Sequence, residues 1–148
     1  MRRFVVTAAA VAVACSGVVI AQKVSSADDL DKVMKRAGAF RQVDKAIQSN
    51  NAGDAKAQLA IVRQAVLDSQ SFWIEHKKQD AVKLNKDALA KLDELEKTLS
   101  AQPFDVATAT AKFKETGGSC RACHQQYRAE DDNNNYILKP GSVAGVSH

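Results

Sequence analysis

The sequence predicts an all-α fold in which residues 28–130 form an up-down-up-down antiparallel four-helix bundle. Two observations lead to this expectation. First, the composition of the 148-residue chain suits helices, with 45% hydrophobic residues, few aromatic rings and only two prolines. Second, apolar residues recur at helical spacing in four segments, and short links between the segments favour antiparallel neighbours. A chain of this length buries one core, so we expect a single domain.

The first helical segment runs from about residue 28 to residue 49. One stripe of apolar residues marks its buried face: Leu30, Val33, Ala37, Phe40 and Ile47. Three aspartates near its start favour a helix N-terminus, where the helix dipole attracts negative charge: Asp28, Asp29 and Asp31. The Asn-Asn-Ala-Gly run of residues 50–53 predicts the turn that ends this segment.

The second and third segments, residues 54–75 and 80–99, carry similar stripes. The second repeats small or apolar residues at Leu59, Val62, Val66, Ser69 and Trp73. The third places its apolar face at Ala81, Ala88, Leu92, Leu95 and Leu99. A polar corner at residues 76–79 separates the two segments. Residues 100–103 end the third segment, and Pro103 suits the first turn of a new helix.

The fourth segment runs from Pro103 to about Glu130. Its stripe alternates spacings of four and three residues: Val106, Thr110, Phe113, Gly117, Cys120, His124 and Tyr127. Each residue of the Gly117-Gly118 pair costs a helix about 1 kcal/mol relative to Ala, so the pair marks either a helix break or a place where bulk is excluded. Because the pair lies close to Cys120, we favour the second interpretation.

Residues 120–124, Cys-Arg-Ala-Cys-His, form the pattern by which a c-type haem is attached covalently. Two thiols three residues apart on a helix reach two neighbouring vinyl groups, and His124 lies one turn beyond the first thiol, where its imidazole can ligate the iron. A zinc site would need a second ligand pair, and a thioredoxin-like pair would need a βαβ setting. The sequence offers neither. We predict one covalent haem c on Cys120 and Cys123, with a chance occurrence of the pattern as the alternative.

The stretch from Gly118 to Arg128, Gly-Ser-Cys-Arg-Ala-Cys-His-Gln-Gln-Tyr-Arg, resembles the C-terminal haem motif of the class II cytochromes c, the cytochrome c′ family. The resemblance spans residue 28 to about residue 128 and implies a haem-bearing four-helix bundle, often a homodimer through its first two helices. It also implies that Arg128 pairs with a haem propionate or tunes the reduction potential. The alternative is an ordinary surface charge.

The same family divides by what its first helix places at the sixth iron position. The Asp-Lys-Val-Met-Lys of residues 31–35 resembles the low-spin members, which implies Met34 as the distal iron ligand. A buried Met commonly fills gaps in a core instead. Leu30 stands where many family members carry Arg, so an alternative register has Leu30 or Val33 facing the iron.

Iron coordination decides the predicted function. With His124 and Met34 both bound, the iron is six-coordinate and low-spin, which suits a one-electron carrier that serves redox partner proteins. With an apolar residue over an empty sixth position, nitric oxide or carbon monoxide can bind instead. We expect no enzyme, because the sequence offers no distal His, second metal site or acid–base pair near the motif.

Residues 1–27 carry the pattern of an export signal, with Met-Arg-Arg followed by an apolar run over residues 4–20. Cleavage after Ala21 or after Ala27 fits this pattern, and the alternatives are an uncleaved anchor or a membrane tether through an acylated Cys15. Export implies a periplasmic protein. Removing residues 1–27 lowers Lys plus Arg from 21 to 18 against 17 Asp plus Glu, so we predict no nucleic-acid partner.

Residues 131–148 extend beyond the usual end of the family. The polar run at 131–135 and the Lys-Pro-Gly at 139–141 cannot continue a helix, so we expect a flexible tail. Alternatively, residues 136–138, Tyr-Ile-Leu, lie back on the bundle or dock a partner.

Overall fold

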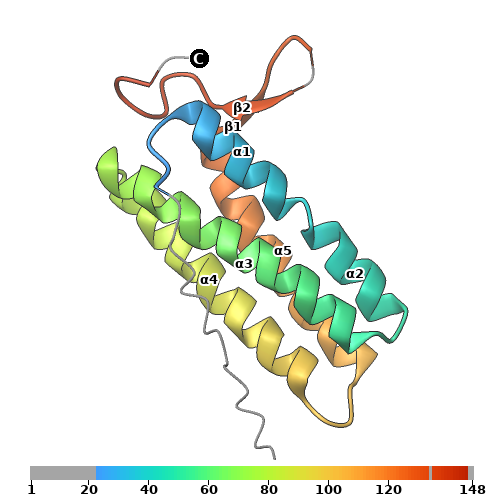
Figure 1. Ribbon diagram of the computed structural model, residues 1–148. Coiled ribbons are helices and arrows are strands. Elements are labelled where there is room, and N and C mark those ends of the chain that lie inside the picture. Colours follow the sequence, from blue (N-terminus) through green and yellow to red (C-terminus); the bar gives the residue numbers. More distant parts are fainter. Residues whose placement is uncertain (1–22, 134, 147–148) are drawn as a thin grey trace, which may run out of the picture.

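A computed structural model describes residues 23–133 and 135–146, and most of these residues are helical (Figure 1). The helices are α1 (Ala27–Ala37), α2 (Phe40–Gln48), α3 (Ala52–Glu75), α4 (Gln79–Ser100) and α5 (Val106–Tyr127). Two short strands follow, β1 (Arg128–Glu130) and β2 (Tyr136–Leu138). The predicted all-α character is confirmed, with helices packed against one another in a bundle.

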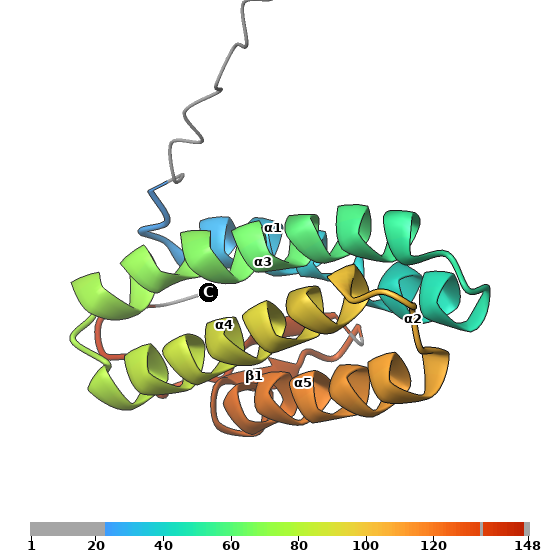
Figure 2. The ribbon, with the colours of Figure 1, turned by 90° about the horizontal axis from the view of Figure 1, so that it is seen from below.

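The helices lie side by side in the order in which the chain forms them. α3 packs against α4, and α4 packs against α5. α1 and α2 follow one another along α3, and α2 also contacts α5 (Figures 1 and 2). α1 reaches β2 at its other side and makes little direct contact with α5. The bundle therefore has an α2 end, where α2 bridges α3 and α5, and an α1 end, where α1 packs between α3 and the strands.

The prediction of one continuous helix over residues 28–49 is wrong, because the helix breaks at Gly38 and Ala39. The amide of Gly38 donates to the Lys35 carbonyl at 3.1 Å, and the amide of Ala39 donates to the Arg36 carbonyl at 3.1 Å. This tighter bonding pattern turns the chain between α1 and α2. A Cβ on residue 38 would lie 2.9 Å from the Lys35 carbonyl oxygen, so the close approach requires glycine.

Side-chain caps fix two helix starts that the sequence located only approximately. The Asn51 side chain accepts a hydrogen bond from the Asp54 amide at 3.0 Å, so α3 begins at Ala52. Asp105 accepts from the amides of Ala107 and Thr108, so α5 begins at Val106 and not at Pro103 as expected. The Asp105 carboxylate, and not Pro103, determines where α5 begins, because the carboxylate accepts hydrogen bonds from two of the amides that a helix start leaves unpaired.

Buried apolar side chains form two clusters, one at each end of the bundle. The α2-end cluster consists of Val43, Ile47, Ala55, Leu59, Val62, Val66, Ala88, Leu92, Leu95, Leu99 and Ala109. The α1-end cluster consists of Val24, Leu30, Val33, Ala65, Phe72, Trp73, Ala81, Val82, Tyr127 and Val143. Every residue of the stripes predicted for α3 and α4 is buried. The stripe predicted for α5 behaves differently, because all of its members except Tyr127 are only half-buried.

In place of the expected flexible tail, the described residues after 130 fold onto the α1 end. β1 and β2 pair antiparallel, with Arg128 opposite Leu138 and Glu130 opposite Tyr136. The pairing explains why α5 ends at Tyr127 and not near Glu130. Val143 is 3% exposed within the α1-end cluster, and Leu138 packs against the same cluster. The structure thus shows the alternative in which Tyr136–Leu138 lies back on the bundle.

The predicted export signal and Cys15 lie outside the described residues. Among the helices that are described, none combines the length and apolarity needed to cross a membrane.

Candidate functional site

Cys120 and Cys123 lie in the last two turns of α5, at the half-buried face of the helix. They form no disulfide with one another. Burial raises the pKa of both thiols, and the nearby Cys120 and Asp80 add to the effect on Cys123, whose pKa rises to about 11. Both thiols are therefore protonated and available at neutral pH.

His124 follows on the same half-buried face. Burial lowers the pKa of its imidazole, and the positive charge of Arg128 lowers it further. Within the part of the chain that the structure describes, no hydrogen-bond partner holds either ring nitrogen. A neutral imidazole with an unshared nitrogen is the form of histidine that ligates a metal.

Met34 lies in α1 and packs, partly buried, against the α1-end cluster. Cys123 borders the same cluster from α5. Leu30 and Val33, the alternative residues for the sixth position, are 5% and 2% exposed and belong to the cluster interior. The fold therefore brings Met34 and Cys123 to the rim of one apolar cluster, although they are far apart in the sequence.

Gly117 and Gly118 lie inside α5, so they mark no helix break. A Cβ on Gly117 would meet the Phe40 ring at 3.6 Å, an ordinary contact, and a Cβ on Gly118 would meet no atom within 4 Å. The Phe40 ring stacks on the Phe113 ring, with centroids 4.2 Å apart. Gly117 lies one turn before Cys120 on the same half-buried face of α5, whereas Gly118 is exposed on the other side of the helix.

Arg128 caps the C-terminal end of α5 and is exposed. Its guanidinium lies 4.0 Å from the centre of the Tyr136 ring, an arrangement that fits a cation–π contact with β2. Arg128 follows His124 by four residues, and its positive charge lowers the pKa of that imidazole. Arg128 therefore links the CxxCH segment to the folded C-terminal residues.

Tyr127 anchors a polar and aromatic group beside Cys123 that sequence patterns did not predict. Its hydroxyl donates a hydrogen bond to the Asp80 carboxylate at the start of α4. The bond lowers the pKa of Asp80, and burial together with this bond raises the pKa of Tyr127. The Trp73 ring lies 4.8 Å from the Tyr127 ring, centre to centre. In the sequence, Asp80 signals only the start of a helix, and nothing there indicates its partner.

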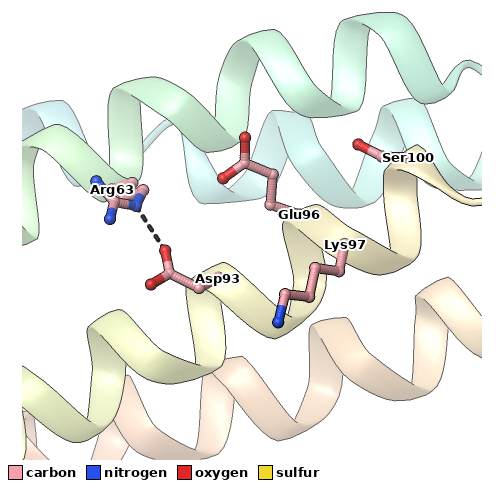
Figure 3. A pocket seen from close by; sticks show the side chains of 5 residues that line it. All are labelled: Arg63, Asp93, Glu96, Lys97 and Ser100. Carbon is pink, nitrogen blue, oxygen red and sulfur yellow. Dashed lines mark hydrogen bonds and ion pairs between the residues drawn. The ribbon is translucent and has the colours of Figure 1, made fainter.

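A second feature, a hollow on the surface between α3 and α4, lies apart from these residues (Figure 3). Its lining is polar and charged: Arg63, Asp93, Glu96, Lys97 and Ser100. Arg63 Nε donates to Asp93 Oδ1 at 2.7 Å, which closes one side of the hollow with an ion pair. None of the predicted haem or iron ligands contributes to this lining.

No protein-family model, curated protein or solved structure matches the chain. The resemblance to class II cytochromes c accordingly rests on the residues of α5 and α1 named above. Across the described residues, no group of three or more His, Cys, Asp and Glu side chains is placed to hold a metal ion.

Proposed function

We propose that this protein is an exported c-type cytochrome with one covalent haem, and that it carries single electrons. The observation that carries the proposal is the half-buried position of Cys120, Cys123 and His124 on α5, with Cys123 and Met34 both packed against the α1-end cluster. An antiparallel up-down-up-down bundle of four helices is part of the same proposal, with α1 and α2 together counting as the first helix.

The residues present fit a haem in three respects. Two protonated thiols on one helix are available for thioether formation with vinyl groups. Gly117 shares the α5 stripe with Cys120 and His124, and its missing side chain leaves room for a flat macrocycle against that face of the helix. The apolar stripe of α5 is only half-buried by the polypeptide, whereas the stripes of α3 and α4 are fully covered, so an additional apolar group would complete the burial of this face.

When bound, haem iron supplies reversible one-electron chemistry, and the chain supplies its ligands and surroundings. His124 would be the proximal ligand, because its lowered pKa keeps the imidazole neutral near pH 7. Met34 would be the distal ligand from α1, and thioether ligation favours the reduced iron and raises the potential. The surrounding Leu30, Val33 and Trp73 exclude water, which adds to the same effect.

Gas binding is a second candidate function, favoured by the burial of Leu30 and Val33 on α1. If either side chain and not the Met34 sulfur stands over the iron, the sixth position is open beneath an apolar cover. Nitric oxide or carbon monoxide would then bind there, as the resemblance to high-spin cytochromes c′ implies.

The contacts of Val24 and Ser26 support export with cleavage after Ala21. Val24 is fully buried in the α1-end cluster, and its amide donates a hydrogen bond to Ser71 Oγ at 2.9 Å. Ser26 caps α1 by accepting from the Asp29 amide at 3.1 Å. Cleavage after Ala27 would remove both residues. We propose a periplasmic protein that exchanges electrons with partner proteins, with a membrane tether through the N-terminus or a homodimer as further possibilities for its assembly.

The test is the optical spectrum of the protein made in a host that attaches c-type haem, for the wild type and Met34→Ala. Covalent haem, a far-red sulfur-to-iron band and resistance to carbon monoxide in the wild type, with loss of the band and of the resistance in Met34→Ala, would support the electron carrier. A high-spin wild type that binds carbon monoxide at once would favour gas binding. A Cys120→Ser, Cys123→Ser double variant serves as the control without covalent haem.

A further inference from the structure

We propose that the C-terminal residues 136–146, here called the C-terminal cap, are a positioning segment that holds α1 so that Met34 faces the haem site. This inference rests on the proposed function and concerns which occupant takes the sixth iron position. The cap consists of β2 and the residues that follow it, and it folds over the α1 end of the bundle (Figure 1).

The cap is fixed to α5 immediately after the CxxCH segment. The amide of Lys139 donates to the Tyr127 carbonyl at 2.7 Å, and β2 pairs with β1 along its whole length. The Arg128 guanidinium lies 4.0 Å from the centre of the Tyr136 ring. The cap is thus tied to the helix that carries His124, by backbone hydrogen bonds and by a cation–π contact.

The cap also packs on α1 through apolar contacts. β2 lies against α1, and Val143, 3% exposed, shares the α1-end cluster with Leu30 and Val33. Leu138 and Val146 pack against the same cluster. The cap therefore connects α5 to α1, two helices that make little direct contact with one another.

α1 depends on such contacts, because a helix of 11 residues is marginal in water by itself. Its C-terminal end is held to α3 by Arg36, whose Nη2 lies 2.6 Å from Asp68 Oδ2. Leu30, near the N-terminal end of α1, belongs to the same buried cluster as Val143 of the cap. Met34 lies between these two attachments, so the cap determines how firmly the Met34 side chain is presented toward the CxxCH face.

The experiment compares the wild type with Val143→Asp and with the milder Val143→Ala, and uses Ala144→Asp as a matched control at an exposed position. Hydrogen exchange is measured along α1 and α2, because α2 lies at the other end of the bundle from the cap and serves as an internal reference (Figure 1). Haem-loaded samples are also tested for the far-red sulfur-to-iron band and for carbon monoxide binding.

We expect both Val143 variants to exchange the amides of α1 about tenfold faster than the wild type, with α2 unchanged, because removing a buried apolar contact shifts the local opening equilibrium by about that factor. In haem-loaded protein they should also lose the far-red band and bind carbon monoxide, while Ala144→Asp matches the wild type. If Val143→Asp does not fold, the comparison of Val143→Ala with the wild type tests the proposal.

Equal exchange of α1 in all four proteins, or an equal rise in α1 and α2, would overturn the proposed bracing of α1. A wild-type far-red band that both Val143 variants retain would overturn the proposed effect on Met34. A wild type that lacks the band would contradict Met34 ligation in the proposed function, and the exchange rates of α1 would still decide whether the cap braces that helix.

Discussion

The ion pair between Arg36 and Asp68 gives a sharp test of how α1 is held. The Asp68 side chain is 2% exposed, and its two oxygens accept from Arg36 Nη2 at 2.6 Å and from Gln64 Nε2 at 2.7 Å. Arg36→Met keeps most of the aliphatic stem and removes the cation. The buried Asp68 carboxylate then loses the positive charge that offsets the cost of its desolvation. Breaking a pair that is buried on both sides costs about 3–5 kcal/mol, and here Asp68 is buried while the Arg36 side chain is 43% exposed, so the upper end of that range does not apply. Because Gln64 remains as a donor, we expect a loss of about 3 kcal/mol, near the low end.

The matched control is Arg63→Met, which breaks a pair of similar length on the surface. Arg63 Nε lies 2.7 Å from Asp93 Oδ1, but the two side chains are 39% and 48% exposed, so water solvates the carboxylate that remains (Figure 3). Exposed pairs contribute under about 1 kcal/mol. Urea unfolding followed by circular dichroism measures both variants, and Arg36→Met should also melt about 10 °C lower than the wild type. Equal losses in the two variants would refute the argument from burial.

Three further results are expected. The hydrogen bond from Tyr127 lowers the pKa of Asp80 below its ordinary value of 3.8, so it stabilises the fold above that pH and the contribution is lost as pH falls through the lowered pKa; the melting temperatures of wild type and Tyr127→Phe should differ at pH 7 and converge in acid. Gly117→Ala should stabilise the haem-free chain by about 1 kcal/mol, because the new methyl makes only an ordinary contact at 3.6 Å with the Phe40 ring, and a similar gain in haem-loaded protein would contradict a haem lying against this residue; Gly118→Ala, at an exposed position, is the control and should gain equally with and without haem. The intact mass of the exported protein should correspond to a chain that begins at Gln22, and a chain that begins at Asp28 would contradict the structural role of Val24.

Much of the scaffold could be predicted because its signals are local and periodic. Apolar residues three and four positions apart in α3 and α4 face the core, and every member of both predicted stripes is buried. The polar corner before α4 and the Asn-rich turn before α3 lie where the sequence places them. Periodicity succeeds here because a long helix with one apolar face has few other ways to bury it.

The differences from prediction arise where tertiary contacts override local signals. The chain turns at Gly38, where a Cβ would lie only 2.9 Å from the Lys35 carbonyl oxygen, so the turn requires glycine. A single glycine in a periodic segment does not by itself predict a helix break. The polar composition after residue 130 indicates a tail, yet Asp131 organises a turn by accepting from the amides of Asn133 and Asn135. Val143 then finds a buried position that depends on helices distant in sequence.

The residues proposed to hold a haem come from the sequence, whereas their surroundings come from the structure. The spacing of Cys120, Cys123 and His124 matches what two thioether bonds and an iron ligand would require, and this assignment stays a prediction. The proximity of Met34 and Cys123 to one cluster follows from the packing of α1 on α3, which no short-range pattern encodes.

Both ends of the bundle combine a fully buried apolar interior with a half-buried rim, and under the proposed function a haem would cover the rim of one end only. At the α2 end, Leu59, Leu92 and Leu95 are at most 1% exposed, and Phe40 and Phe113 lie half-buried at the rim. At the α1 end, Met34 and Cys123 lie half-buried at the rim. Covering an apolar side chain fully contributes about 1.5–3 kcal/mol, so a haem at this rim would stabilise the α1 end in particular. The haem-free chain should therefore open first at α1 and the C-terminal cap, while α3, α4 and the α2 end remain folded.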